Sequence, residues 1–371
     1  MDLPKYKDLT QPQRTILNLP IGKNHLIVGP PGTGKTVLAI YRASDIFNAG
    51  LNVLMLVYNR PLMYYITSAV KSLGIDAVVN TWQSWISSFY LTEIMKPVPK
   101  IDEKRFTYDW KKIKADFSKV GHKYDHVILD ESQDIPIELL ESLLLISGSI
   151  TCFTDEDQTI MQNDTDTGDI ANVLNVRNAY RLYENFRNTK EIFDFAKLYQ
   201  PNVIINTNRS NTLKEKPNFI QAGATGETFI ERFIDDLVKI IERNYAYKKI
   251  GIFVNSKHLY AAYNELLSRL PNNDVYLYKA QSEYNTIDFE QDGIFILSFN
   301  CMKGLEFDIV IIPWFERINS NNNVNLDRNT VYVAVTRAKH QVYCLYTDKS
   351  WAGYIDSFGP IRGHEQLLKW E

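Results

Sequence analysis

Short apolar runs alternate with amphipathic segments along the whole chain. In the first half, runs at 24–29, 52–57, 76–80, 124–130 and 149–154 have the length of buried strands, and segments beginning near 35, 61 and 81 have helical spacing. In the second half, strand-like runs occur at 218–222, 249–254, 274–279, 293–298, 308–313 and 340–347, with a helical segment at 226–244. This alternation predicts α/β architecture with parallel, doubly wound sheets.

The length of 371 residues predicts two domains, because one core rarely grows to that size. The loop at 162–169 is polar and rich in turn-forming residues, and strand-like sequence restarts at 179–183. We therefore expect a first domain at 1–170, with a small insertion around 86–122, and a second domain at 171–371.

Composition narrows the class of protein only slightly. A hydrophobic fraction of 45% and a charged fraction of 23% are ordinary for a globular protein, and the net charge of −3 leaves no global basic surface. Any nucleic-acid surface must then be local. The three cysteines have no paired spacing, and no apolar run reaches the roughly 18 residues of a membrane span. We expect a cytoplasmic protein with no membrane partner.

A phosphate-binding loop is the clearest chemical motif. The segment GPPGTGKT at 29–36 matches G-x-x-x-x-G-K-[ST] between a strand and a helix. Its backbone N–H groups would surround phosphate oxygens, Lys35 would reach the β and γ phosphates, and the Thr36 hydroxyl would bind Mg²⁺. The predicted nucleotide contacts of this loop are Gly29, Pro30, Pro31, Gly32, Thr33, Gly34, Lys35 and Thr36. An ordinary glycine-rich turn with a surface lysine is the weaker reading.

An acidic motif supplies the partner of this loop. In VILDESQD at 127–134, a buried strand delivers Asp130 to the carboxyl edge of the sheet, where ligands bind in such folds. Asp130 would hold Mg²⁺, and Glu131 would orient or deprotonate the attacking water. An acidic helix cap is the alternative for this motif taken alone. Together the two motifs predict nucleotide hydrolysis.

The ordered motifs resemble superfamily 1 helicases and translocases of the UvrD/Rep type. LTQPQ, TDEDQTI, ENFRN, KGLEFD and VAVTRA accompany the two motifs above. The resemblance implies two RecA-like domains flanking an ATP cleft. Its implied roles are adenine reading by Gln13, γ-phosphate sensing by Gln158, adenine stacking by Phe186, arginine fingers at Arg187 and Arg337, and further nucleotide contacts from Gly304 and Glu306. A structural ion pair with Asp327 or Glu306 is the alternative for Arg337.

The same resemblance implies a track for single-stranded nucleic acid. VYNRPL at 57–62 and TWQSW at 81–85 match its strand-contact motifs in the first domain. Phosphate, sugar or base contacts are expected from Asn59, Arg60, Thr81, Trp82 and Ser84, and from Ser298 and Asn300 in the second domain. Core packing is an equal alternative for Trp82, and Trp85 is expected in the core.

Three departures from the family limit the functional reading. The sensing motif continues as IMQNDTDTGD, Asn300 replaces the usual histidine, and the gaps at 86–126 and 189–292 hold no large inserted subdomain. The favoured function is an ATP-dependent single-stranded-DNA translocase or helicase using ATP and Mg²⁺. The alternatives are a regulatory ATPase switch or loader working with a partner nuclease in repair or antiviral defence, and third, an RNA-directed helicase.

Overall fold

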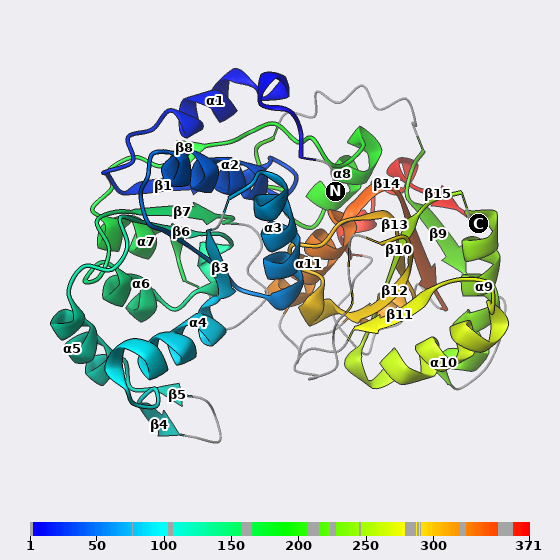
Figure 1. The fold of residues 1–371 in the computed structure, drawn as a ribbon. Coiled ribbons are helices and arrows are strands. Elements are labelled where there is room, and N and C mark those ends of the chain that lie inside the picture. Colours follow the sequence, from blue (N-terminus) through cyan, green and yellow to red (C-terminus); the bar gives the residue numbers. More distant parts are fainter. Residues whose placement is uncertain are drawn as a thin grey trace. The chain divides into compact units, whose positions relative to one another are not determined.

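The chain separates into two compact units, Met1–Tyr183 and Glu184–Glu371 (Figure 1). This computed structural model describes residues 3–75, 77–102, 107–156, 165–205, 215–222, 228–244, 246–278, 287, 289, 291–318, 324–347 and 359–371. Each unit is built on a parallel sheet, and the two are described separately below.

Unit 1 contains a six-stranded parallel sheet in the order β3-β2-β6-β7-β1-β8. Every pairing in this sheet is parallel, so the carboxyl ends of its strands lie at one edge. The strands are β1 (His25–Val28), β2 (Val53–Val57), β3 (Val78–Thr81), β6 (His126–Leu129), β7 (Ile150–Thr154) and β8 (Tyr180–Arg181).

Helices cover both faces of this sheet because the strands are apolar on both faces. In β1, Leu26 and Val28 pack into one core, whereas Ile27 packs into the other. Helices α1 (Gln11–Leu17), α2 (Lys35–Asn48) and α3 (Arg60–Ser72) fill the second core, and α4 (Trp82–Phe89), α5 (Trp110–Val120), α6 (Ile137–Leu143) and α7 (Thr167–Leu174) fill the first (Figure 1).

A small antiparallel hairpin interrupts unit 1 between α4 and α5. It consists of β4 (Lys100–Asp102) and β5 (Thr107–Tyr108). Tyr108 and Trp110 pack against Trp82, so aromatic side chains attach the insertion to the first core.

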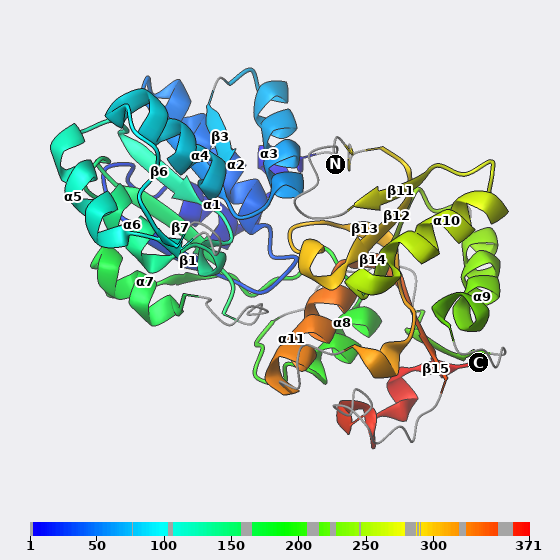
Figure 2. The ribbon, with the colours of Figure 1, turned by 90° about the horizontal axis from the view of Figure 1, so that it is seen from below.

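Unit 2 contains a seven-stranded parallel sheet in the order β11-β12-β10-β13-β14-β9-β15 (Figure 1), and Figure 2 shows β11 to β14 from another side. Its strands are β9 (Asn218–Gln221), β10 (Lys249–Val254), β11 (Val275–Tyr278), β12 (Gly293–Ser298), β13 (Phe307–Ile312), β14 (Ala338–Tyr346) and β15 (Lys369–Trp370). Its helices are α8 (Lys190–Lys197), α9 (Phe229–Arg243), α10 (Leu259–Arg269) and α11 (Val324–Val335).

The two faces of the second sheet are covered by different helices. Side chains of β10, β12 and β13 such as Ile252, Ile296 and Ile309 share a core with α9 and α10. On β9, Phe219 packs edge to face against Phe195 of α8. The expectation of two parallel, doubly wound, RecA-like α/β sheets is confirmed by this topology.

The expected boundary at residue 170 needs correction. It falls inside α7, and β8 adds to the edge of the first sheet by pairing with β1. Leu182 N–H then donates to the carbonyl of Val28 over 2.8 Å. Residues 171–183 therefore belong to unit 1, because the second stretch of strand-like sequence begins by completing the first sheet.

The carboxyl-terminal segment packs on unit 2. Lys369 and Trp370 form β15, which pairs with β9, and the Trp370 ring lies 5.0 Å from that of Phe219. The final residues thus extend the second sheet at its edge.

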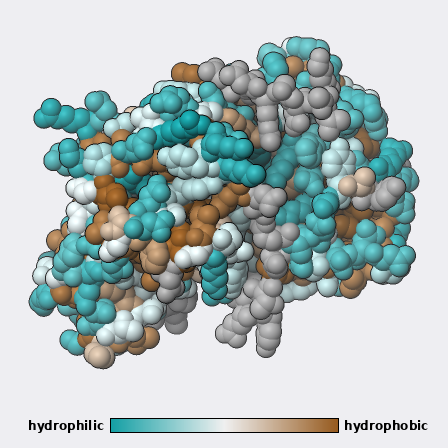
Figure 3. Space-filling model, turned by 45° about the horizontal axis from the view of Figure 1, so that its top comes forward, coloured by the Kyte–Doolittle hydropathy of each residue, from teal (hydrophilic) through white to brown (hydrophobic). Residues whose placement is uncertain are grey.

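The surface in Figure 3 is mostly hydrophilic, with hydrophobic patches between the polar residues. Among the described residues, no helix combines the length and the hydrophobicity that crossing a membrane requires. The hydrophobic residues are instead concentrated in the cores of the two sheets.

Candidate nucleotide and nucleic-acid sites

The phosphate-binding loop connects β1 to α2 at the carboxyl edge of the first sheet. Gly34 adopts a φ of 88° as the N-cap of α2, a conformation that L side chains rarely adopt. A Cβ on Gly29 would lie 2.8 Å from Thr33 Oγ1 and 3.0 Å from Leu182 Cβ. Both ends of the loop therefore require glycine. The loop leads directly into the first turn of α2, and a helix N-terminus favours a bound anion.

Lys35 is buried and held by the loop itself. Its Nζ donates to the carbonyls of Gly29 at 2.5 Å and Pro30 at 3.2 Å, and it pairs with Asp155 Oδ2 at 3.3 Å. Asp155 follows β7 directly, so its carboxylate reaches the same edge of the sheet as the loop. This lysine is thus pre-positioned for a phosphate group by its backbone and carboxylate partners.

Gln13 contacts the loop from α1. Its Nε2 donates to the Thr33 carbonyl over 3.1 Å, and its Oε1 accepts from the Thr10 N–H over 2.9 Å in a capping box. The glutamine predicted to read adenine is therefore fixed beside the phosphate-binding loop.

The predicted metal-binding pair is assembled in unit 1. Thr36 Oγ1 donates to Asp130 Oδ2 over 2.7 Å, although Thr36 lies in the first turn of α2 and Asp130 directly follows β6. Burial, followed by the neighbouring Glu131, raises the pKa of Asp130. One hydroxyl and one carboxylate are oxygen donors of the kind that Mg²⁺ prefers with phosphates and water completing its shell. The donor set fits Mg²⁺.

Glu131 has an unusual backbone. Its φ is 53°, in the left-handed region that non-glycine residues rarely occupy. Gln133 Nε2 donates to its Oε2 over 2.6 Å, while Gln133 Oε1 accepts from Thr154 Oγ1 and from the N–H of Asp155. A strained backbone over-determined by such contacts is typical of functional sites.

Four of the residues expected to contact a nucleic-acid strand lie near the ends of β2 and β3. Asn59 caps α3 by accepting from the Leu62 N–H, and Thr81 caps α4 by accepting from the Ser84 N–H. Arg60 and Ser84 are exposed. These four residues follow β2 and β3 at the same edge of the sheet as the phosphate-binding loop.

Trp82 does not present a surface for base stacking. Only 7% of it is exposed, and its ring packs edge to face on Tyr108 at 5.7 Å. Trp85 is also buried and donates to the Tyr124 hydroxyl over 3.2 Å. Of the two equal expectations for Trp82, this burial favours core packing over base stacking, because Tyr108 of the hairpin packs against its ring.

The side chains of two predicted residues are not among those that the structure describes. Gln158 lies outside the described residues, as does the side chain of Asn300. Ser298 is buried at the carboxyl end of β12, where its hydroxyl donates to Cys301 Sγ over 3.2 Å.

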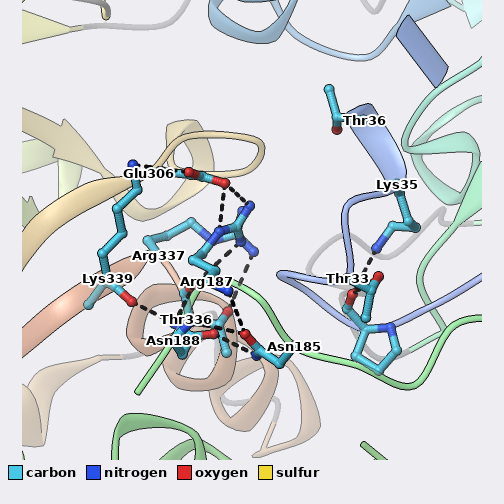
Figure 4. A network of polar contacts seen from close by, with 12 residues as sticks. Thr33, Lys35, Thr36, Asn185, Arg187, Asn188, Glu306, Thr336, Arg337 and Lys339 are labelled. Atoms are coloured by element: carbon cyan, nitrogen blue, oxygen red, sulfur yellow. Dashed lines mark hydrogen bonds and ion pairs between the residues drawn. The ribbon is translucent and has the colours of Figure 1, made fainter. Parts of the chain in front are cut away.

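In unit 2, the predicted arginine fingers lie at the amino edges of β13 and β14. Arg187 Nε donates to Glu306 Oε1 over 2.7 Å, and Glu306 Oε2 also pairs with Lys339 at 3.3 Å (Figure 4). Burial would raise the pKa of Glu306, but Arg187, Lys339 and Arg337 outweigh it and lower that pKa to about 2. Glu306 is thus a carboxylate surrounded by cations.

Arg337 is 1% exposed and precedes β14. Its Nε donates to the Val333 carbonyl over 3.1 Å and its Nη2 to Thr336 Oγ1 over 3.4 Å. Nearby, Gly304 has a φ of 75°, and Phe186 is 36% exposed. Burying an arginine here is costly unless anions or carbonyl dipoles meet it.

Sequence reasoning missed four contributors to these sites: Gln133, Asp155, Asn188 and Lys339. Asp155 carries a recognisable signal, because it is an acidic residue directly after a buried strand, as Asp130 is. Asn188 ends the quoted motif ENFRN, but the motif does not indicate its bonds to backbone carbonyls 148 and 150 residues away.

One known protein family matches part of unit 2. Residues 293–345 match the model of the UvrD-like helicase C-terminal domain. This match spans β12 to β14 and includes Ser298, Gly304, Glu306 and Arg337. No curated protein sequence matches the chain.

Two matching solved structures carry descriptions that mention a helicase. The C-terminal domain of a possible DNA helicase from Lactobacillus plantarum WCFS1 is 20% identical, with a TM-score of 0.36, over 50% of this chain and 98% of that one. Arterivirus nonstructural protein 10, a helicase, is 13% identical, with a TM-score of 0.45, over 94% of this chain and 63% of that one. The chain thus spans less than two thirds of the arterivirus protein.

Proposed function

Residues 293–345 match the UvrD-like helicase C-terminal domain, and we propose that the chain is a motor of helicase superfamily 1, of the UvrD/Rep type, that hydrolyses ATP and translocates on single-stranded DNA. The observation that carries the proposal is the joint arrangement of Lys35, Thr36 and Asp130 at one sheet edge. Those residues and their spacing are what binding and hydrolysing a nucleoside triphosphate requires.

In this proposal the nucleotide phosphates bind the N–H groups of residues 29–36 and the first turn of α2. Lys35 transfers its hydrogen bonds from loop carbonyls to phosphate oxygens, which concentrates positive charge on the transferring group. Thr36 and Asp130 would hold Mg²⁺, which would supply positive charge that neutralises the phosphates. Gln13 and Phe186 bind the adenine.

Glu131 orients the attacking water and accepts its proton. Its strained backbone and its hydrogen bond from Gln133 restrict the carboxylate to few positions, which favours an in-line water. Arg187 and Arg337 stabilise the charge on the transferring phosphoryl group, an effect on the order of 10³ to 10⁵ in rate for arginine fingers.

Strand binding is proposed at the carboxyl edge of the first sheet. Arg60 supplies a phosphate contact, and Asn59, Thr81 and Ser84 supply neutral donors and acceptors beside it. Ser298 and Asn300 extend the contacts in the second unit. DNA is proposed over RNA from the resemblance, and the support for a local track is that Arg60 and Ser84 are exposed.

The test is steady-state ATP hydrolysis by the wild type and by Lys35→Ala. We expect the variant to lose hydrolysis while its thermal unfolding temperature stays near that of the wild type. Lys23→Ala, which replaces an exposed lysine of the same unit, is the matched control and should hydrolyse normally. Near-normal hydrolysis by Lys35→Ala would overturn the site assignment.

A further inference from the structure

Asn188 is completely buried and spans the backbone on both sides of Arg337. Its Nδ2 donates to the Thr336 carbonyl over 3.1 Å and to the Ala338 carbonyl over 2.5 Å (Figure 4). The carboxamide of Asn188 therefore holds the carbonyl groups of the two residues that flank Arg337.

The same side chain is tied to the loop that carries Arg187. Asn188 Oδ1 accepts from Asn185 Nδ2 over 2.9 Å. Asn185 Oδ1 in turn accepts from the N–H groups of Arg187 at 2.8 Å and Asn188 at 2.9 Å. This closed set of bonds fixes the backbone of Arg187 relative to Asn188.

A third segment joins the same cluster at the start of β13. Glu306 binds the Arg187 guanidinium through Nε and Nη2, and the adjacent Phe307 N–H donates to the Arg337 carbonyl over 3.0 Å. Arg187 Nη1 also reaches the Thr336 carbonyl at 3.4 Å. The Thr336 carbonyl therefore accepts from both Arg187 and Asn188.

These contacts place three segments distant in sequence in one hydrogen-bonded cluster. We propose that Asn188 is a positioning residue that holds Arg187 and Arg337 in a single fixed arrangement, so that the two guanidinium groups act on the phosphoryl group as a pair. The inference rests on the proposed ATP hydrolysis. Its physical basis is that a buried, hydrogen-bonded polar network is rigid, whereas removing one member takes hydrogen bonds away from buried partners.

A misplaced guanidinium loses transition-state stabilisation more than substrate binding. Asn188→Ala is therefore expected to lower kcat by about tenfold or more, with KM for ATP changed by less than about threefold. Arg337→Lys already lacks the planar guanidinium group. In that background the loss of kcat caused by Asn188→Ala should be several-fold smaller, because residues in contact are energetically coupled.

The matched control is Asn244→Ala, which removes an asparagine-to-carbonyl bond elsewhere in unit 2, from Asn244 Nδ2 to Ile240. It should leave kcat unchanged. Asn188→Asp keeps the size of the side chain and an acceptor oxygen but loses the N–H donors. It replaces Asn188→Ala if the alanine variant does not fold. An unchanged kcat, or the same loss in both backgrounds, would make Asn188 a general stability residue and overturn the proposal.

A second readout does not depend on hydrolysis. Nitrogen-15 spectra resolve arginine Nε–H groups, and we expect the signals of both Arg187 and Arg337 to shift or broaden in Asn188→Ala and to stay in place in Asn244→Ala. A wild type without ATPase activity would refute the proposed function alone, because the spectra still decide whether Asn188 positions both arginines. Unmoved arginine signals would refute the positioning role alone.

Discussion

Gln133 Nε2 donates a 2.6 Å hydrogen bond to the carboxylate of Glu131, whose backbone φ is 53°. Gln133 is itself held by Thr154 and by the N–H of Asp155, so the acidic motif and the end of β7 share one amide group. The residue proposed to activate water is thus fixed both by its backbone and by a neighbour.

Replacing Glu131 by glutamine should abolish steady-state hydrolysis, with a loss on the order of 10² to 10⁴ in kcat, because an amide cannot accept the proton of the attacking water. ATP affinity, measured by equilibrium binding of a fluorescent ATP analogue, should stay close to that of the wild type. Glu138→Gln on α6 is the control and should behave normally. Near-normal turnover by Glu131→Gln would remove Glu131 from the site.

Arg337→Ala should keep ATP affinity within about tenfold and lose most of kcat, as expected for a group that acts mainly in the transition state. Initial rates across a range of ATP concentrations separate a change in kcat from a change in KM for ATP. Because Arg337 is buried, thermal unfolding is measured in parallel. Arg269→Ala, at a partly exposed arginine of the same unit, is the control. A folded Arg337→Ala enzyme with unchanged kcat would show that this arginine is structural.

Arg60→Ala and Trp82→Ala should have opposite phenotypes. Losing Arg60 removes one proposed phosphate contact, so affinity for a single-stranded oligonucleotide should fall and the log–log salt slope should decrease by about 1. Losing the buried Trp82 should instead cost about 3–5 kcal/mol in the free energy of unfolding. Fluorescence anisotropy and urea titration measure these quantities. Unchanged binding by Arg60→Ala would contradict the proposed track.

His126 should make the fold sensitive to mild acid. Burial, with a contribution from Arg42, lowers its pKa to about 3, while Nδ1 contacts the Ile21 carbonyl at 2.9 Å and Nε2 contacts Thr151 Oγ1 at 2.7 Å. The unfolded chain binds a proton below pH 6.5 that the folded chain does not bind until about pH 3. The contribution of His126 to the free energy of unfolding is therefore complete above pH 6.5 and is lost as the pH falls from 6.5 towards 3.

At pH 5 the expected loss from His126 alone is about 2 kcal/mol relative to pH 8. Urea unfolding at both pH values measures it, and His126→Gln should reduce the difference by that amount. An equal pH dependence in the variant would mean that other groups cause the acid sensitivity.

The sequence predicts most strands and the phosphate-binding loop because these depend on local pattern. Lys35, Thr36 and Asp130 could be identified since each follows a buried strand or a glycine-rich turn. The domain boundary could not be located, because β8 has only two residues and its pairing with β1 depends on distant backbone groups. Trp82 was ambiguous for a similar reason: its helical position does not reveal that Tyr108 covers its ring.

Contacts made through backbone carbonyls also escape sequence analysis. Asn188 and Thr336 are far apart in the chain, and a carbonyl acceptor has no residue-type signature. The pairing of Arg187 with Glu306 joins two recognisable motifs, but neither motif indicates the other as its partner.

The central claim is that ATP hydrolysis is coupled to a single strand of DNA. The most direct measurement is the steady-state ATPase rate of the wild type with and without a single-stranded DNA oligonucleotide, with RNA of the same sequence and duplex DNA as controls. We expect strong stimulation by single-stranded DNA and weaker stimulation by the controls. A rate that single-stranded DNA leaves unchanged would contradict it and would favour an ATP-dependent switch.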